Sequence, residues 1–406
     1  MKKTLLTICL VWMCFSLSAQ KIIDLSGKWS FSIDRQDNGE KEKWFSHTLN
    51  DFINLPGSMP EKLKGDEVTA KTQWTGSLYD SSYYYNPYME KYRKEGNIKF
   101  PFFLTPDKHY VGAAWYQKEV NIPADWKGER ILLFLERPHI ETTVWVNGQK
   151  TGMQNSLCVP HQYDITRYVR PGKCTITIRV DNRIKEINVG PDSHSITDQT
   201  QGNWNGIVGR ICLQTTPKTY FDDIQIYPEP EQKLARVKVV IKGTGTAKVK
   251  LSAESFNTDK KHIVPAIQQE IKLNKGVTET EMVLPMGNDM LLWDEFHPAL
   301  YKLKAEVTNG KKTEIKEIQF GIRRFEIKGK WFYVNGRKTQ LRGTVENCDF
   351  PLTGYAPMDV ESWERVFRIC RSYGLNHMRF HSFCPPEAAF MAADRVGFYL
   401  DRKSVV

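Results

Sequence analysis

The chain has 406 residues, of which 12% are aromatic, and its 57 lysines and arginines exceed its 47 aspartates and glutamates, giving a net charge of +10. This length predicts two to four domains of ordinary size. The basic residues are spread along the chain rather than clustered, which argues against a nucleic-acid partner. Aromatic rings stack on sugars but also fill β-sandwich cores, so the composition leaves both roles open.

The first nineteen residues are typical of an export signal that is removed from the mature protein. Lys2 and Lys3 form its positive end, residues 5–17 are apolar, and Ser18 and Ala19 supply small residues for cleavage. No later segment is a long enough apolar run to cross a membrane, so we expect no membrane span. The sequence therefore predicts an exported protein, periplasmic or extracellular.

Six cysteines follow this signal, and their spacing decides little about function. They are Cys158, Cys174, Cys212, Cys348, Cys370 and Cys384. The spacings match neither a disulfide framework nor a zinc site, so we expect free thiols, no bound metal and no cofactor.

Residues 20–219 have the pattern of a β-sandwich. Short segments predict strands at residues 29–33, 114–122, 130–136, 141–146 and 175–180. Asn147 and Gly148 are typical of a hairpin turn, and many short strands separated by turns favour a jelly-roll sandwich.

Residues 57–112 form a long insertion rich in tyrosine and proline. A loop this long usually has a function or is mobile, so we expect it near a ligand site, with a packing role as the equal alternative.

Residues 220–322 form a second β-rich region. Alternating segments at 235–241, 247–253 and 300–307 fit a small immunoglobulin-like sandwich. Nothing in this region suggests chemistry, so its expected role is to space and brace its neighbours.

Residues 323–406 change to strands that alternate with helices. A hairpin is predicted at 325–334, with its turn at Asn335 and Gly336. It is followed by strands and helices predicted at residues 339–343, 358–373, 375–381, 385–397 and 398–400. This order predicts parallel pairing, in a doubly wound sheet or a (β/α)8 TIM barrel. Because a closed barrel needs roughly 200 to 250 residues, we expect an incomplete barrel limited to its first two βα units.

Four short motifs stand out in the first sandwich: residues 115–118 (WYQK), 144–148 (VWVNG), 163–166 (YDIT) and 206–210 (GIVGR). They resemble the sugar-binding domain of glycoside hydrolase family 2, which includes β-galactosidases, β-glucuronidases and β-mannosidases. Others resemble its middle immunoglobulin-like domain and its first barrel strands: residues 292–293 (LW), 298–303 (PALYKL), 320–323 (FGIR), 342–343 (RG) and 373–381 (YGLNHMRFH). The order of the three domains also matches.

This resemblance implies a retaining exo-glycosidase that hydrolyses terminal O-glycosidic bonds of a carbohydrate substrate. It also implies that the two catalytic glutamates belong to later barrel strands, which this sequence does not contain. We therefore assign no catalytic residue and expect this truncated chain to be inactive. The alternative is a non-catalytic carbohydrate-binding protein. The sequence does not determine the sugar, the linkage or the oligomeric state.

Four candidate substrate-binding residues lie at the ends of the predicted barrel strands, where barrel enzymes hold their reactive side chains. Glu346 and Asp349 follow the first strand, and their roles are sugar binding or structure rather than a catalytic pair. Arg379 and His381 end the second strand two residues apart, so they share one face. Arg379 has the alternative role of an ion pair between neighbouring strands.

The fifth candidate is Trp204, which lies between Asn203 and Asn205 in a glycine-rich loop of the first sandwich. We expect its ring to be exposed and to stack on a sugar, with core packing as the alternative.

Overall fold

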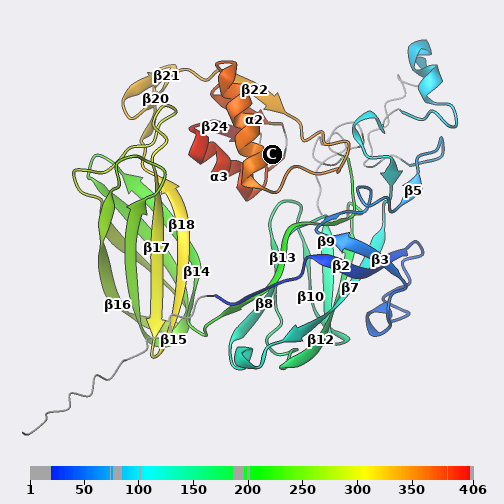
Figure 1. Cartoon of the computed structure of the whole chain (residues 1–406), viewed down its shortest axis with the longest axis horizontal. Helices are drawn as coiled ribbons and strands as arrows, with labels where there is room; N and C mark the ends of the chain where they lie inside the picture. The colour runs from blue at the N-terminus through cyan, green and yellow to red at the C-terminus, as the bar shows by residue number, and fades with distance from the viewer. Residues whose placement is uncertain are drawn as a thin grey trace, which may run out of the picture.

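A computed structural model describes residues 20–73, 75, 85–99, 102–185, 196, 198, 202–381 and 383–402. The predicted export signal at residues 1–19 lies outside these ranges. The described chain is mostly β and forms three regions (Figure 1). Two β-sandwiches lie side by side, and a small α/β region lies between them at one end.

The first sandwich contains the strands predicted from alternation, extended by a few residues at some ends. They are β1 (Ile22–Asp24), β2 (Gly27–Asp34), β3 (Asp51–Leu55), β4 (Gly57–Ser58), β7 (Ala113–Ile122), β8 (Arg130–Pro138), β9 (Glu141–Val146), β10 (Gln149–Asn155), β11 (His161–Asp164), β12 (Gly172–Asp181) and β13 (Gly206–Thr216). One sheet has the order β1-β13-β8-β11, with β4 paired to β13, and the other has the order β10-β9-β12-β7-β2-β3.

Alternation along these strands explains the core between the two sheets. Ile176, Ile178 and Val180 of β12 are fully buried, as are Leu133 and Leu135 of β8. Each set is spaced by two residues, so each strand turns one apolar face inward. The predicted hairpin turn between β9 and β10 is confirmed: Asn147 and Gly148 have φ angles of 50° and 78°, as a type I′ turn requires.

The insertion at residues 57–112 holds little regular structure. Its elements are β4, β5 (Asp66–Glu67), a 3₁₀ helix at Pro87–Tyr92, a 3₁₀ helix at Phe102–Leu104, and β6 (Lys108–His109). Residues 74, 76–84 and 100–101, which include much of its tyrosine-rich part, lie outside the described ranges. The side chains of Thr105 and Pro106, near the end of the insertion, lie close to two glycines. A Cβ atom placed on Gly202 would be 3.3 Å from Thr105, and one placed on Gly354 would be 3.5 Å from Pro106. The end of the insertion therefore packs beside the Trp204 loop.

The second sandwich consists of β14 (Tyr220–Glu229), β15 (Leu234–Ser255), β16 (Ile263–Pro285), β17 (Leu300–Asn309) and β18 (Lys312–Gly321). Its order is β14-β15-β17-β18, with β16 paired to β15. The prediction of separate strands at 235–241 and 247–253 is wrong, because both belong to β15. The glycines between them do not make a turn. They form an irregularity in the pairing of β15 with β16, at which Gly245 has a φ of 85°.

The third region begins with β19 (Phe325–Lys328), β20 (Trp331–Val334) and β21 (Arg337–Thr339), which form an antiparallel sheet. It continues with β22 (Gly343–Glu346), α2 (Val360–Ser372), β23 (His377–Phe380), α3 (Glu387–Val396) and β24 (Tyr399–Arg402). Strands β22, β23 and β24 pair in parallel, as the alternation of strands and helices predicts.

The predicted strand at residues 339–343 is wrong in its boundaries. Thr339 belongs to β21, where it pairs with Phe332, and β22 begins only at Gly343. Between them, the backbone N–H of Arg342 donates to the side chain of Asn376 at 2.8 Å. This bond is outside any strand ladder, so residues 340–342 are a link between two sheets.

Local signals set the two helices of this region. The Asp359 side chain accepts from the Ser362 N–H at 2.7 Å and caps α2. The predicted stop of each helix is also confirmed: Gly374 and Gly397 have φ angles of 80° and 74°. The helices cover one face of the parallel sheet, where Trp363 of α2 packs on Phe380 of β23 with ring centroids 5.6 Å apart. Among the described residues, no helix is long and apolar enough to cross a membrane.

The second sandwich holds the α/β region through a buried contact. The Trp293 indole donates to the carbonyl of Asp394 at 2.7 Å. The Asn376 side chain, which is 1% exposed, donates to Glu295 at 2.8 Å. Arg371 donates to the Glu295 carbonyl at 2.7 Å. These bonds fix the amino end of β23 and the end of α3 against the second sandwich.

Candidate functional site

The carboxyl ends of the parallel strands face the first sandwich. Residues 347–358 follow β22 and reach the sandwich, where the Tyr355 hydroxyl donates to Glu61 at 3.0 Å. After β23, the carbonyl of Cys384 accepts a hydrogen bond from Arg137 of β8. Because parallel sheets place functional side chains at this edge, the junction is the candidate site.

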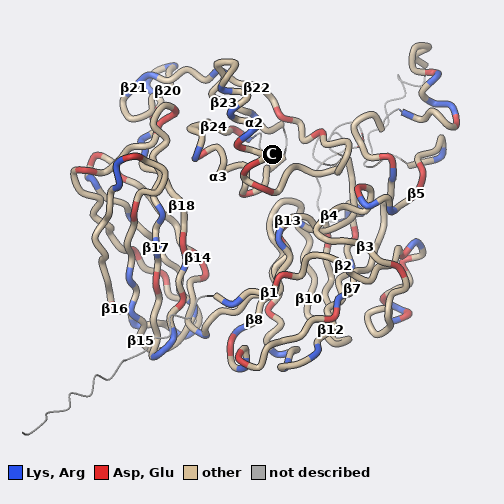
Figure 2. The backbone as a smooth tube through the Cα atoms, viewed as in Figure 1, with Lys and Arg blue, Asp and Glu red and all other residues tan. Residues whose placement is uncertain are grey.

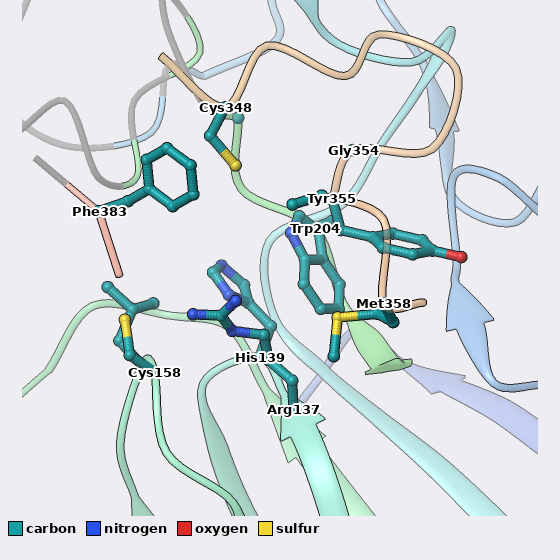
Figure 3. Close-up of a pocket in the computed structure, with 12 residues that line it drawn as sticks. Arg137, His139, Cys158, Trp204, Cys348, Gly354, Tyr355, Met358 and Phe383 are labelled. Atoms are coloured by element: carbon teal, nitrogen blue, oxygen red, sulfur yellow. The ribbon is translucent and has the colours of Figure 1, made fainter. Parts of the chain in front are cut away.

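A small cavity lies at this junction, and both regions line it (Figure 3). Arg137, His139, Cys158 and Trp204 line it from the sandwich, and Cys348, Tyr355, Met358 and Phe383 line it from the α/β region. Its volume is about 50 Å³, which holds a few water molecules at about 10–15 Å³ each. Ligand pockets usually exceed about 300 Å³, so this cavity is too small for a sugar ring.

Trp204 is buried in this junction, and the prediction that its ring is exposed is wrong. The side chain is 6% exposed. Its indole stacks on His139, with ring centroids 4.5 Å apart, and touches Tyr355, with centroids 5.6 Å apart. Residues 347–358 cover the ring, and a Cβ atom on Gly354 would lie only 3.4 Å from it. The alternative role, core packing, is the one that the structure supports.

His139 is a buried member of the site that the sequence did not reveal. Its Nε2 lies 3.1 Å from the Asn203 side-chain oxygen, and Asn203 in turn donates to the carbonyl of Asn182 at 2.9 Å. Burial lowers the pKa of His139 to about 3, so the ring is neutral near pH 7. It holds the Trp204 loop by stacking and hydrogen bonding rather than by charge. No local pattern around residue 139 marks this role.

Glu346 and Asp349 are electrostatic neighbours, because the Asp349 carboxylate adds to the effect of burial in raising the pKa of Glu346. Glu346 ends β22 in register with Phe380, so its side chain starts on the helix-covered face of the sheet. It accepts from the Cys348 N–H at 2.7 Å, and burial raises its pKa. Asp349 instead lines a groove of about 1010 Å³ between the first sandwich and α3, together with Arg210 and Glu387.

Arg379 lies on the opposite, open face of the parallel sheet. It is in register with Val345 and Asp401, and all three are exposed. Its Nε lies 3.9 Å from the Asp401 carboxylate, with both side chains about half exposed. The ion pair that we weighed as an alternative is therefore present at the limit of contact distance. A sugar contact through Arg379 stays a prediction.

His381 lies just beyond β23, beside the end of β22. Its backbone N–H donates to the Glu346 carbonyl at 2.8 Å, and its Nδ1 lies 3.0 Å from the Asn347 side-chain oxygen. The carboxyl ends of β22 and β23 thus bring Glu346, Arg379 and His381 together at one edge of the parallel sheet. Trp204 contacts the loop that follows β22. Among the described residues, no group of three or more His, Cys, Asp or Glu side chains is placed to hold a metal ion.

Both β regions match one protein family. Residues 22–217 match "Glycosyl hydrolases family 2, sugar binding domain", and residues 219–323 match "Glycosyl hydrolases family 2". The similar curated proteins include a β-glucuronidase of Paenibacillus borealis, 24% identical over 93% of this chain and 58% of that protein. A β-galactosidase of Thermoanaerobacter pseudethanolicus is also 24% identical, over 74% of this chain and 40% of that protein. This chain spans about half the length of the curated relatives that it matches.

Solved structures with the same fold cover nearly the whole chain. A β-glucuronidase from Ruminococcus gnavus superposes with a TM-score of 0.67 at 18% identity, over 95% of this chain and 60% of that one. A family 2 member from Bacteroides cellulosilyticus gives 0.66 at 19% identity, over 93% of this chain and 47% of that one. At this identity the likeness concerns the fold alone.

Proposed function

Because this chain belongs to glycosyl hydrolase family 2, we propose that it contributes its two β domains and three parallel strands to a retaining exo-glycosidase. That enzyme hydrolyses terminal O-glycosidic bonds of oligo- or polysaccharides. The glycosidase names of the relatives support this activity. In this proposal β22, β23 and β24 are the start of a TIM barrel, and the sandwich junction closes one side of the substrate site.

The placement of the carboxylates carries a second part of the proposal: these 406 residues alone do not hydrolyse glycosides. A retaining mechanism needs two carboxyl groups about 5–5.5 Å apart, one as nucleophile and one as acid and base. Glu346 starts on the helix-covered face, whereas Asp349 lines a groove outside the sheet. Asp401 lies beside Arg379 on the open face. Glu346 and Asp349 are near enough to interact, but both are half-buried and the Glu346 carboxylate is held by the Cys348 N–H, which supports a structural pair rather than a catalytic one.

We assign sugar contacts to Arg379 and His381 at the strand ends. A guanidinium forms strong paired hydrogen bonds with a carboxylate, and it also donates to hydroxyls. The half-exposed Arg379 is free to exchange its long contact with Asp401 for a ligand oxygen. These contacts suit a uronic acid as well as a neutral sugar.

The test is an assay of the 406-residue chain on aryl β-glycosides of glucuronic acid, galactose and mannose. We expect no release of the aryl group above that of heat-denatured protein. Turnover that Glu346→Gln abolishes would overturn the proposal that the chain lacks a catalytic carboxylate. Turnover that the substitution leaves unchanged would place the catalytic groups elsewhere in the chain.

The alternative of a purely carbohydrate-binding protein loses support from the burial of Trp204. Such a protein would need exposed aromatic rings, such as Trp204 and those of the tyrosine-rich insertion, to stack on the sugar, and the Trp204 ring is only 6% exposed. Saturable binding of a neutral oligosaccharide by the two β domains would revive it.

We also propose that the protein is exported, on the basis of the signal pattern in residues 1–19. Expression of the whole chain in a bacterial host, followed by fractionation, tests this. Export predicts a product in the periplasm or medium that has lost about nineteen residues, and a cytoplasmic product of full mass contradicts it.

A further inference from the structure

The sheet β19–β20–β21 presents an exposed basic and aromatic surface at the end of the parallel strands opposite the candidate site. The sheet leads into the amino end of β22, whereas the candidate site lies at the carboxyl ends. Residues 323–338 contain one carboxylate, Glu326, and a set of six basic side chains: Arg323, Arg324, Lys328, Lys330, Arg337 and Lys338. Figure 2 shows blue segments along this hairpin, next to one end of the second sandwich.

Register places an indole and several cations on one face of this sheet, which we call the Trp331 face (Lys328, Lys330, Trp331, Tyr333 and Lys338). Lys328 pairs with Trp331, and Tyr333 pairs with Lys338, so their side chains lie on the same side. Lys330 is in the adjoining turn. The Lys338 ammonium lies 3.2 Å from the centroid of the Trp331 ring, and that of Lys330 lies 5.5 Å from it.

The protein neutralises only part of the positive charge of the Trp331 face: Lys328 lies 3.4 Å from Glu326, which the register places on the same face, opposite Tyr333. Glu326 is occupied by Arg324 and Lys328. Within the described ranges, Lys330 and Lys338 have no carboxylate within ion-pair distance, and both ammonium groups lie over the Trp331 ring. Trp331 is 39% exposed. The partly exposed indole therefore carries two ammonium groups over its ring, neither of them paired with a carboxylate among the described residues. An anionic ligand with a flat apolar face can draw these flexible side chains off the ring and stack in their place.

We infer that the Trp331 face binds an acidic polysaccharide. A uronate pyranose combines an apolar C–H face, which stacks on an indole, with a ring carboxylate that accepts hydrogen bonds from ammonium groups. A neutral sugar uses the indole but leaves the ammonium groups unused. Duplex nucleic acid offers anionic phosphates but keeps its bases stacked inside the helix, away from an exposed indole. The surface thus acts as a docking site for the polymer, separate from the edge that holds Arg379 and His381.

Fluorescence anisotropy with a labelled polygalacturonate oligosaccharide and the full chain tests this inference, and it does not depend on hydrolysis. We expect saturable binding that weakens as salt screens the charges. The double variant Lys330→Ser/Lys338→Ser should weaken binding about fivefold or more. Trp331→Ala should weaken it by a similar factor of about five, and Trp331→Phe should restore part of the loss.

The matched control is Lys272→Ser/Lys275→Ser, which removes the same charge from exposed lysines of the second sandwich. This control should bind like the parent chain, and a labelled neutral gluco-oligosaccharide should not bind at these concentrations. Three results overturn the inference: no binding of the polyuronate, equal losses in both lysine pairs, or duplex DNA that binds as tightly as the polyuronate.

Discussion

The indole of Trp204 lies on the imidazole of His139, with ring centroids 4.5 Å apart and planes 18° from parallel. Tyr355, from the loop after β22, contacts the Trp204 ring, with ring centroids 5.6 Å apart. The first sandwich and the α/β region therefore share one buried aromatic contact. This contact fixes the sandwich against the strand ends that we propose as part of the sugar site.

Replacing Trp204 by alanine should destabilise the first sandwich strongly. Removal of a buried tryptophan costs about 3–5 kcal/mol, since it loses apolar burial and leaves a cavity. Urea unfolding followed by circular dichroism measures the change in the free energy of unfolding. The control, Trp331→Ala, removes the same side chain from an exposed position and should cost about 1 kcal/mol or less. Equal losses in the two variants would contradict the packing role of Trp204.

The stability of the first sandwich should fall as the pH drops below about 6.5, in part because of His139. Burial lowers the pKa of His139 from 6.5 to about 3. In the unfolded chain the imidazole of residue 139 is protonated below about pH 6.5, whereas in the folded chain it is protonated only below about pH 3. Between these values the unfolded state binds one more proton, so lowering the pH favours unfolding. For one group the slope reaches about 1.4 kcal/mol per pH unit.

Urea unfolding at pH 7 and pH 5 measures this slope in the parent chain and in His139→Gln. Glutamine keeps a hydrogen-bonding group but does not protonate, so the loss of stability between the two pH values should shrink. His47→Gln, at an exposed position, should leave the loss unchanged. A parent slope that His139→Gln does not reduce would mean that other groups carry the pH dependence.

Substituting Asn376 should loosen the α/β region from the second sandwich. Its amide donates to Glu295 and accepts from the Arg342 N–H, both at 2.8 Å, and it is 1% exposed. Asn376→Ala leaves these groups unpaired, at a cost of about 1–3 kcal/mol for a buried partner. Limited proteolysis should then cut between residues 323 and 402 sooner than in the parent. Asn288→Ala, at an exposed position, is the control, and equal cleavage rates for both variants would contradict the anchoring role.

The thiols should differ in reactivity according to their burial. Cys174 is 1% exposed, and burial raises its pKa to about 11, whereas Cys158 lies half-buried at the rim of the junction cavity. At pH 8 Cys174 should carry about one thiolate per thousand molecules. Iodoacetamide labelling read by peptide mass spectrometry should modify Cys158 in the native chain and Cys174 only after unfolding. Native labelling of Cys174 at the rate of Cys158 would show that the core opens.

Strand periodicity and capping residues sufficed to predict much of the fold. Short β-rich segments located β7, β8, β9 and β12. Their burial does not simply alternate, since all six residues of β9 are buried. Asp359 and Gly374 located the ends of α2, since caps act within one turn. The link at 340–342 was missed because its stabilising partner, Asn376, lies more than thirty residues away. The continuity of β15 was missed because glycines that usually mark a turn form an irregularity there.

The candidate site was less predictable, because its geometry depends on contacts between distant segments. Burial of Trp204 requires the loop at 347–358, which lies about 150 residues further along the chain. The predicted strand at 339–343 left Glu346 in a loop, whereas the observed β22 extends to Glu346 and assigns its side chain to the helix-covered face. In a strand, a shift of one residue exchanges the two faces, so an error of a few residues changes which side chains face a ligand.

The most direct test of the account is covalent trapping. A fluorinated aryl glycoside that accumulates the glycosyl-enzyme intermediate of retaining glycosidases is incubated with the 406-residue chain, and intact mass is measured. The account predicts an unchanged mass with the glucuronide, galactoside and mannoside reagents, because the neighbouring carboxylates Glu346 and Asp349 are half-buried and Glu346 is held by the Cys348 N–H. A one-to-one adduct mapped to Glu346, Asp349 or any other carboxylate of this chain would contradict it.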